Sequence, residues 1–139
     1  MNRQDAKSAK HPEPDKKFDD FAAVVVDAAL EVHRQLGPGF LESGYEEALA
    51  VELGLRRVAF ERQVPIALTY KQVPIGQARL DLVVGGCLVV ELKATECLLP
   101  IHLAQVLSYL KATKQPLGLL INFNVSTLRQ GIKRVVRTP

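Results

Sequence analysis

Three charged residues interrupt two apolar runs near the middle of the chain. The stretch reads R-L-D-L-V-V-G-G-C-L-V-V-E-L-K-A-T, with Asp81 in the first run and Glu91 and Lys93 in the second. The runs are rich in β-branched residues and flank Gly85-Gly86, which is typical of a β-hairpin. A charge within such strands is costly unless it is paired or binds a metal. This hairpin is therefore the first candidate for a functional site.

Alternation along the two strands separates the charges from the apolar side chains, because residues two apart share a face. One predicted face is wholly apolar and suited to packing on a helix: Leu80, Leu82, Val84, Leu88, Val90, Leu92 and Ala94. The other face carries the three charged residues together with Arg79, Val83, Cys87, Val89 and Thr95.

The length of the loop decides whether the two carboxylates share that second face. A two-residue Gly85-Gly86 loop puts them on opposite faces of the sheet. A three-residue loop over 84–86 pairs Asp81 with Val89. Glu91 is then the diagonal neighbour of Asp81, about 7 to 8 Å away between backbones and close enough to share one metal ion. We therefore predict the three-residue loop.

The pattern of Asp81 followed by Glu91-x-Lys93 on the next strand resembles the signature of the PD-(D/E)xK nuclease superfamily. An E-x-K triplet alone arises by chance roughly half the time in a chain of this length. The segment G-F-L-E-S-G-Y, from Gly39 to Tyr45, is similar to the motif that names the small bacterial GxxExxY family of that superfamily. Further marks of that family extend the resemblance over about residues 20–136: L-G-P-G-F, R-Q-x-P-I, V-E-L-K-A, H-x-x-Q-x-x-x-Y-L, L-L-I-N-F and G-I-K-R.

This resemblance implies an α/β fold of the restriction-endonuclease-like kind, with an αβββαβ core and a central mixed sheet flanked by helices. It implies metal-dependent hydrolysis of DNA or RNA phosphodiester bonds, with Mg²⁺ or Mn²⁺ as the cofactor. Carboxylates with waters and substrate phosphates suit Mg²⁺. The metal ligands are then Asp81, Glu91 and the backbone carbonyl of Leu92, with Glu42 or Glu46 added from a helix. The motif position favours Glu42, and a solvated helix face explains Glu46 nearly as well.

Three further residues have roles that the resemblance implies. Lys93 would orient the attacking water and stabilise the developing negative charge. Gln105 and Tyr109 would contact the scissile strand or that water; without the hairpin they read as an ordinary polar helix face. His102 is a weaker candidate, because a lone histidine is more often structural. Scattered basic residues are plausible phosphate contacts: Lys111, Lys114, Lys133, Arg134 and Arg137.

Composition sets the class of protein. A chain of 139 residues with 47% hydrophobic and 24% charged residues is typical of one globular domain. The net charge of +3 is compatible with a polyanionic partner without requiring one. Two cysteines without metal-site spacing, and no membrane span or signal-peptide core, favour a cytoplasmic protein that does not enter a membrane.

Periodicity gives the elements that must position the candidate residues. Helices are expected over residues 18–36 and 41–57 and from residue 100, strands over 59–70, 75–83, 87–95 and 117–123, and a strand or short helix over 131–137. Pro65 makes its part of the first strand an edge or a bulge. Residues 1–17 contain almost nothing apolar, so we expect a disordered tail followed by one nuclease-like domain over 18–139.

A competing function belongs to another class: a catalytically inactive module of the same fold that binds nucleic acid or a protein partner. The three charged residues of the hairpin favour the enzyme, because a module freed from catalysis has no reason to keep buried charge. A homodimer is an open option, since dimers are common among nucleases of this fold. The sequence leaves open the choice of DNA or RNA, any sequence specificity, the oligomeric state and the pathway.

Overall fold

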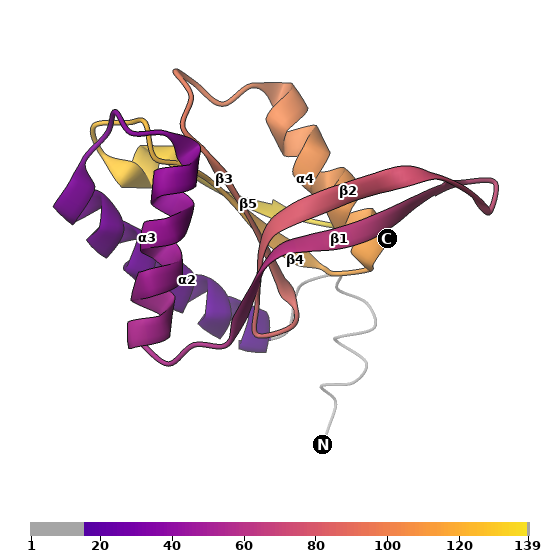
Figure 1. Ribbon diagram of the computed structural model, residues 1–139, viewed down its shortest axis with the longest axis horizontal. Helices are drawn as coiled ribbons and strands as arrows, with labels where there is room; N and C mark the ends of the chain where they lie inside the picture. Colours follow the sequence, from indigo (N-terminus) through magenta and orange to yellow (C-terminus); the bar gives the residue numbers. More distant parts are fainter. Residues whose placement is uncertain (1–15, 139) are drawn as a thin grey trace.

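The computed structural model describes residues 16–138, so the predicted tail lies almost wholly outside the described residues. Helix α2 begins at Lys16, two residues before the expected start. The helices are α2 (Lys16–Leu36), α3 (Glu42–Leu55) and α4 (Pro100–Thr113), with a short 3-10 helix η1 (Leu128–Gly131). The strands are β1 (Phe60–Tyr70), β2 (Val73–Val84), β3 (Leu88–Lys93), β4 (Leu117–Asn122) and β5 (Ile132–Val136) (Figure 1).

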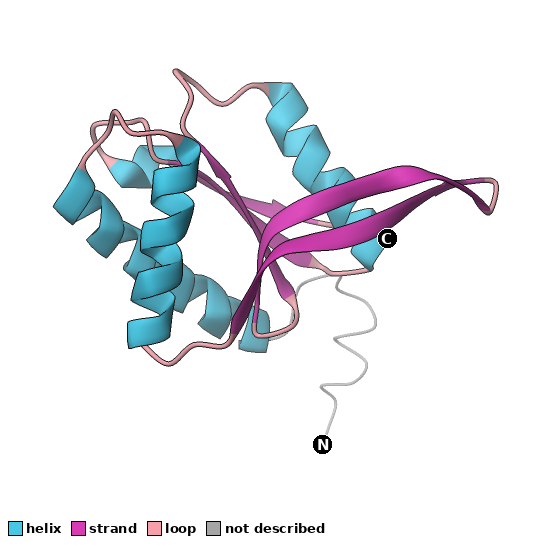
Figure 2. Cartoon of the chain, viewed as in Figure 1, coloured by secondary structure: helices cyan, strands magenta, loops and turns pink. Residues whose placement is uncertain are grey.

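The five strands form one mixed sheet in the order β1-β2-β3-β4-β5. Strands β3 and β4 are parallel, and every other neighbouring pair is antiparallel. Helices α2 and α3 cover one face, and α4 covers the other (Figure 2). The crossover from β3 through α4 to β4 is what a parallel pair requires. This arrangement confirms the predicted α/β fold with a restriction-endonuclease-like sheet.

Two apolar layers hold the helices to the sheet. The larger layer joins α2 and α3 to buried side chains that include Leu82, Val84 and Val90. The smaller layer joins α4 to the other face, through Leu80 and Val89 among others. No helix of residues 16–138 is long and apolar enough to cross a membrane.

The hairpin between β2 and β3 has a three-residue loop, but one residue later than predicted. Val84 pairs with Leu88, so the loop consists of Gly85, Gly86 and Cys87. Both glycines have positive φ angles, 63° and 73°, which an L side chain rarely adopts. The Phe21 ring of α2 also packs against Gly85, where a Cβ atom would clash with it. These two constraints fix the loop, and the predicted register of Asp81 opposite Val89 is wrong.

The expected apolar face of β2 is also interrupted. Leu82 packs in the layer of α2 and α3, whereas Leu80 packs in the layer of α4, although the two should share a face. Strand β1 changes in the same way, since Phe60 contacts the first layer and Val64 the second. At the level of Asp81, the buried side chains of both strands therefore change from one face of the sheet to the other. Beyond this level, the β1–β2 hairpin projects past the rest of the sheet (Figure 1).

Candidate active site

Asp81 and Glu91 stand opposite each other at the base of the projecting hairpin. The regular ladder between β2 and β3 ends at Leu82 and Val90, and one step further its register places Asp81 across from Glu91. The backbone N–H of Asp81 donates to Oε2 of Glu91 at 2.7 Å. The backbone N–H of Leu92 donates to Oδ2 of Asp81 at 2.8 Å. Each carboxylate thus receives a hydrogen bond from the strand that carries the other.

These carboxylates lie in an environment that disfavours their negative charge. Glu91 is only 4% exposed. Burial, and then the charge of Asp81, raises the pKa of Glu91 to about 8. Burial also raises the pKa of Asp81, against the hydrogen bond from Leu92, which lowers it. A bound cation would remove this electrostatic cost, and the oxygen ligands present suit a hard divalent ion.

Glu42 reaches the same region from the first turn of α3. Partial desolvation, and then the charge of Asp81, raises the pKa of Glu42. Within residues 16–138, however, no three His, Cys, Asp or Glu side chains are grouped as ligands of one metal ion. The described arrangement therefore centres on the Asp81–Glu91 pair, with Glu42 in range of its charge.

The segment from Gly39 to Tyr45 gives Glu42 its place. Gly39 has a φ of 107°, which favours glycine. The buried Tyr45 hydroxyl donates to the Gly37 carbonyl at 2.6 Å and accepts from the Phe40 N–H at 3.2 Å. Its ring stacks on Phe123 with centroids 4.5 Å apart. Tyr45 thus anchors the loop before α3 and fixes where the helix begins.

Lys93 is half-buried on β3 and is the cation of the site. Its charge lowers the pKa of Glu42, Asp81 and Glu91, so it lies near all three acids. Among the described side chains it has no carboxylate within 4.0 Å, the limit for an ion pair. A plain surface pair of Glu91 with Lys93 therefore does not describe the arrangement.

Helix α4 covers the face of β3 that carries Glu91, because Val89, two residues earlier on the strand, packs in the layer of α4. Burial, and then the charges of Glu91 and Asp81, raises the pKa of Tyr109, with the Gln105 side chain opposing the shift. Tyr109 thus lies near both carboxylates, with Gln105 beside it. His102 instead accepts a hydrogen bond through Nδ1 from the Leu99 N–H at 3.0 Å and caps the start of α4.

Arg62 and Gln63 of β1 had no role in the sequence analysis, yet both lie at the site. They bind Glu46, which is buried rather than solvated. Arg62 Nε donates to Glu46 Oε2 at 3.1 Å, and Gln63 Nε2 donates to Glu46 Oε1 at 3.0 Å. The R-Q-x-P-I motif was the available signal, but nothing in its spacing shows that both side chains meet one carboxylate.

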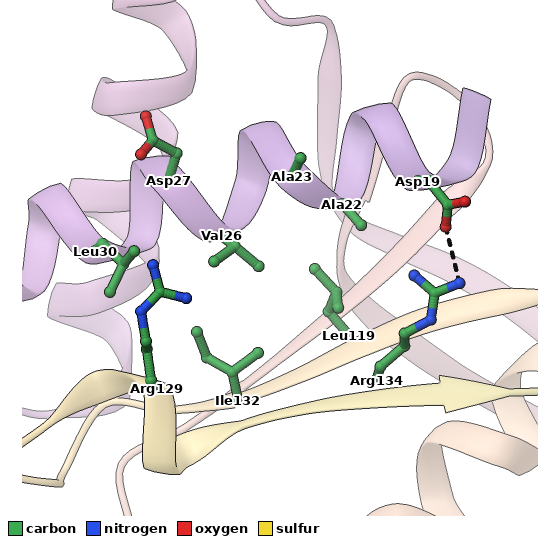
Figure 3. A pocket seen from close by; sticks show the side chains of 10 residues that line it. All are labelled: Asp19, Ala22, Ala23, Val26, Asp27, Leu30, Leu119, Arg129, Ile132 and Arg134. Atoms are coloured by element: carbon green, nitrogen blue, oxygen red, sulfur yellow. Dashed lines mark ion pairs between the residues drawn. The ribbon is translucent and has the colours of Figure 1, made fainter. Parts of the chain in front are cut away.

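Basic residues near the C-terminus serve the fold. Arg134 forms an ion pair with Asp19 of α2 at 2.8 Å, at one end of a hollow of about 440 Å³ between α2 and β5 (Figure 3). Arg134 lines this hollow, but none of the residues predicted as metal ligands or catalytic residues does. The Arg137 guanidinium donates to the Gln115 carbonyl at 3.0 Å. Both arginines thus have contacts within the fold, and their predicted contacts with phosphate stay predictions.

One comparison with known proteins gives a match. A family model described as the PD-(D/E)XK nuclease superfamily matches residues 19–135. No curated protein and no solved structure matches the chain. The matched region contains all of the residues placed around the Asp81–Glu91 pair.

Proposed function

Because the chain belongs to the PD-(D/E)XK nuclease superfamily, whose members generally use divalent metals, we propose that it hydrolyses DNA or RNA phosphodiester bonds with Mg²⁺ or Mn²⁺. The observation that carries the proposal is that the carboxylates of Asp81 and Glu91 each accept a hydrogen bond from a backbone N–H of the other's strand. These hydrogen bonds hold two acids of raised pKa together, near a lysine with no ion-pair partner among the described residues.

Asp81, Glu91 and the backbone carbonyl of Leu92 would hold the metal ion. The N–H of Leu92 points at Asp81, and the N–H and carbonyl of one residue in an extended strand point to the same neighbouring strand. The carbonyl is therefore on the side of Asp81. When bound, the ion would neutralise phosphate charge and lower the pKa of a water. Glu42 is an additional ligand candidate, through a water or after a rotamer change.

The protein side chains would supply positioning and charge. Lys93 would orient the attacking water and offset the negative charge that develops on the phosphate. Tyr109 and Gln105 would contact the scissile strand from helix α4. The nucleic acid would thus lie between α4 and the start of α3, over the end of β3.

We also propose that the chain is of the GxxExxY branch of the superfamily. The support is that each named position of the motif has a distinct part here: Gly39 turns the backbone, Glu42 approaches Asp81 and Tyr45 anchors the helix. The cytoplasmic location and the homodimer stay predictions from the sequence.

Cleavage assays test the proposed function. Single- and double-stranded DNA and RNA, each incubated with Mg²⁺ or Mn²⁺, should include at least one substrate that the wild type cuts and Asp81→Asn does not. Glu61→Gln is a matched control, because it neutralises an exposed carboxylate on neighbouring β1. It should cut as the wild type does. Binding of nucleic acid without metal-dependent cleavage would instead support the inactive module.

A further inference from the structure

The ladder between β1 and β2 skips one level. Arg62 pairs with Leu82 and Val64 with Leu80, but Gln63 and Asp81, which lie between these pairs, do not pair. This is the level at which both strands exchange their faces. The gap in the ladder therefore coincides with the carboxylate of the candidate site.

Gln63 has the backbone geometry that explains the gap. Its φ is 51°, in the left-handed region, which costs a residue other than glycine roughly 1 to 2 kcal/mol. Neighbouring side chains in a regular strand point to opposite faces, yet Arg62 and Gln63 both bind Glu46. The left-handed residue turns the Gln63 side chain to the same carboxylate as Arg62, and the two contacts offset part of its cost.

The gap has a direct consequence for Asp81. In a continuous ladder its N–H would bond to a neighbouring strand, as backbone groups of buried strands do. Here that N–H donates to Oε2 of Glu91 instead. The contact that joins the two carboxyl-bearing residues thus uses a donor that the break at Gln63 leaves free.

We propose that Gln63 is a positioning residue for the Asp81–Glu91 pair. Its left-handed backbone keeps Asp81 out of the β1 ladder, so that the Asp81 N–H holds the Glu91 carboxylate. Its amide, bound to Glu46, keeps Gln63 in that conformation. Gln63 is not among the proposed metal ligands, although hydrogen bonding by its side chain lowers the pKa of Asp81; its effect on metal binding rests on the proposed function.

Two substitutions at residue 63 separate the backbone from the side chain. Gln63→Gly accepts a positive φ without strain, whereas Gln63→Val favours a regular strand because its branched Cβ disfavours that region. The Gly variant, which lacks the amide but accepts the left-handed backbone, should bind Mn²⁺ in calorimetric titration more tightly than the Val variant and no more tightly than the wild type. The Val variant should bind it roughly 10- to 100-fold more weakly, as when support of a ligand is lost. Ala67→Val, an exposed position on the same strand, is the control and should bind normally.

A second readout is independent of metal. In NMR spectra of the metal-free protein, the Asp81 amide proton should show a nuclear Overhauser contact to the side-chain protons of Glu91. The contact should persist in Gln63→Gly and vanish in Gln63→Val. If the Val variant does not fold, Gln63→Ala replaces it. The left-handed backbone costs alanine more free energy than glycine, so the contact should be weaker in the Ala variant than in the Gly variant.

The outcomes are distinguishable. Equal Mn²⁺ affinity and an unchanged contact in the Gly and Val variants would overturn the role of Gln63. If the wild type binds no Mn²⁺, the proposed function fails, and the NMR contact alone then decides whether Gln63 positions Asp81.

Discussion

Glu91 accepts a 2.7 Å hydrogen bond from the backbone N–H of Asp81, so the residues that carry the two carboxylates are joined before any cation binds. Because the donor is a backbone group, the contact exists whether Glu91 is ionised or neutral. The burial that raises the pKa of Glu91 to about 8 makes the neutral form the main one near pH 7 in the metal-free protein.

Glu91→Gln should leave the metal-free protein as stable as the wild type or more so. The amide oxygen can still accept from Asp81, and the amide is neutral without a proton, so the variant avoids the free-energy cost of keeping a buried carboxyl group protonated at this pH. Thermal melts at pH 7.5 with and without Mg²⁺ measure this. Metal should raise the melting temperature of the wild type and not that of the variant. An earlier-melting variant, beside a wild type indifferent to metal, would make Glu91 a structural residue.

Stability of the metal-free protein should fall as the pH rises from about 4.5 to about 8. In that interval the unfolded chain has lost the Glu91 proton while the folded protein keeps it, because the folded pKa is the higher one. The loss is on the order of 4 kcal/mol at its upper limit. Urea unfolding across this range measures the slope, and Glu91→Gln should flatten it. An unchanged slope in that variant would assign the pH dependence to other groups.

Metal affinity should rise with pH over the same interval. A cation binds the carboxylate form, so binding near pH 7 should release a proton from the Asp81–Glu91 pair. Titrations in buffers of different ionisation enthalpy count the protons released. Binding without proton release would mean that the two acids are already ionised and that their pKa values are not raised.

Lys93→Met should reduce cleavage more than metal binding. The ammonium would act on the attacking water and the developing charge, a role worth roughly 10²- to 10⁴-fold in rate. Calorimetry and single-turnover cleavage separate the two effects. Lys93→Arg keeps the charge and is the control. Parallel losses of Mn²⁺ affinity and rate would instead indicate that Lys93 only shapes the ligand pair.

Tyr45→Phe should lower stability by about 0.5 to 1.5 kcal/mol, because two partly buried hydrogen bonds, to the Gly37 carbonyl and from the Phe40 N–H, are lost. The ring can still stack on Phe123, so the fold should persist. Urea unfolding gives the change. Unchanged stability would show that water replaces the hydroxyl and that the motif tyrosine is not an anchor.

The sequence predicted that Asp81 and Glu91 lie together, as the structure shows, but not the register of the strands that carry them. Charges in otherwise apolar strands made Asp81, Glu91 and Lys93 the candidates, and a three-residue loop put the two acids on one side of the hairpin. The register was wrong because it depends on which residues take positive φ, and the packing of Phe21 on Gly85 is a tertiary contact. The predicted alternation of side chains between faces failed at Leu80, which lies beyond the level of Gln63 and Asp81. The sequence does not reveal that Gln63 has a left-handed backbone.

The most direct test of the account is a calorimetric titration of Mn²⁺ into the wild type, Asp81→Asn and Glu91→Gln. The account predicts one binding event in the wild type, with affinity that falls sharply in both variants while their circular dichroism spectra stay unchanged. Equal affinity in all three proteins, or no binding by the folded wild type at millimolar Mn²⁺, would contradict a metal site on the Asp81–Glu91 pair.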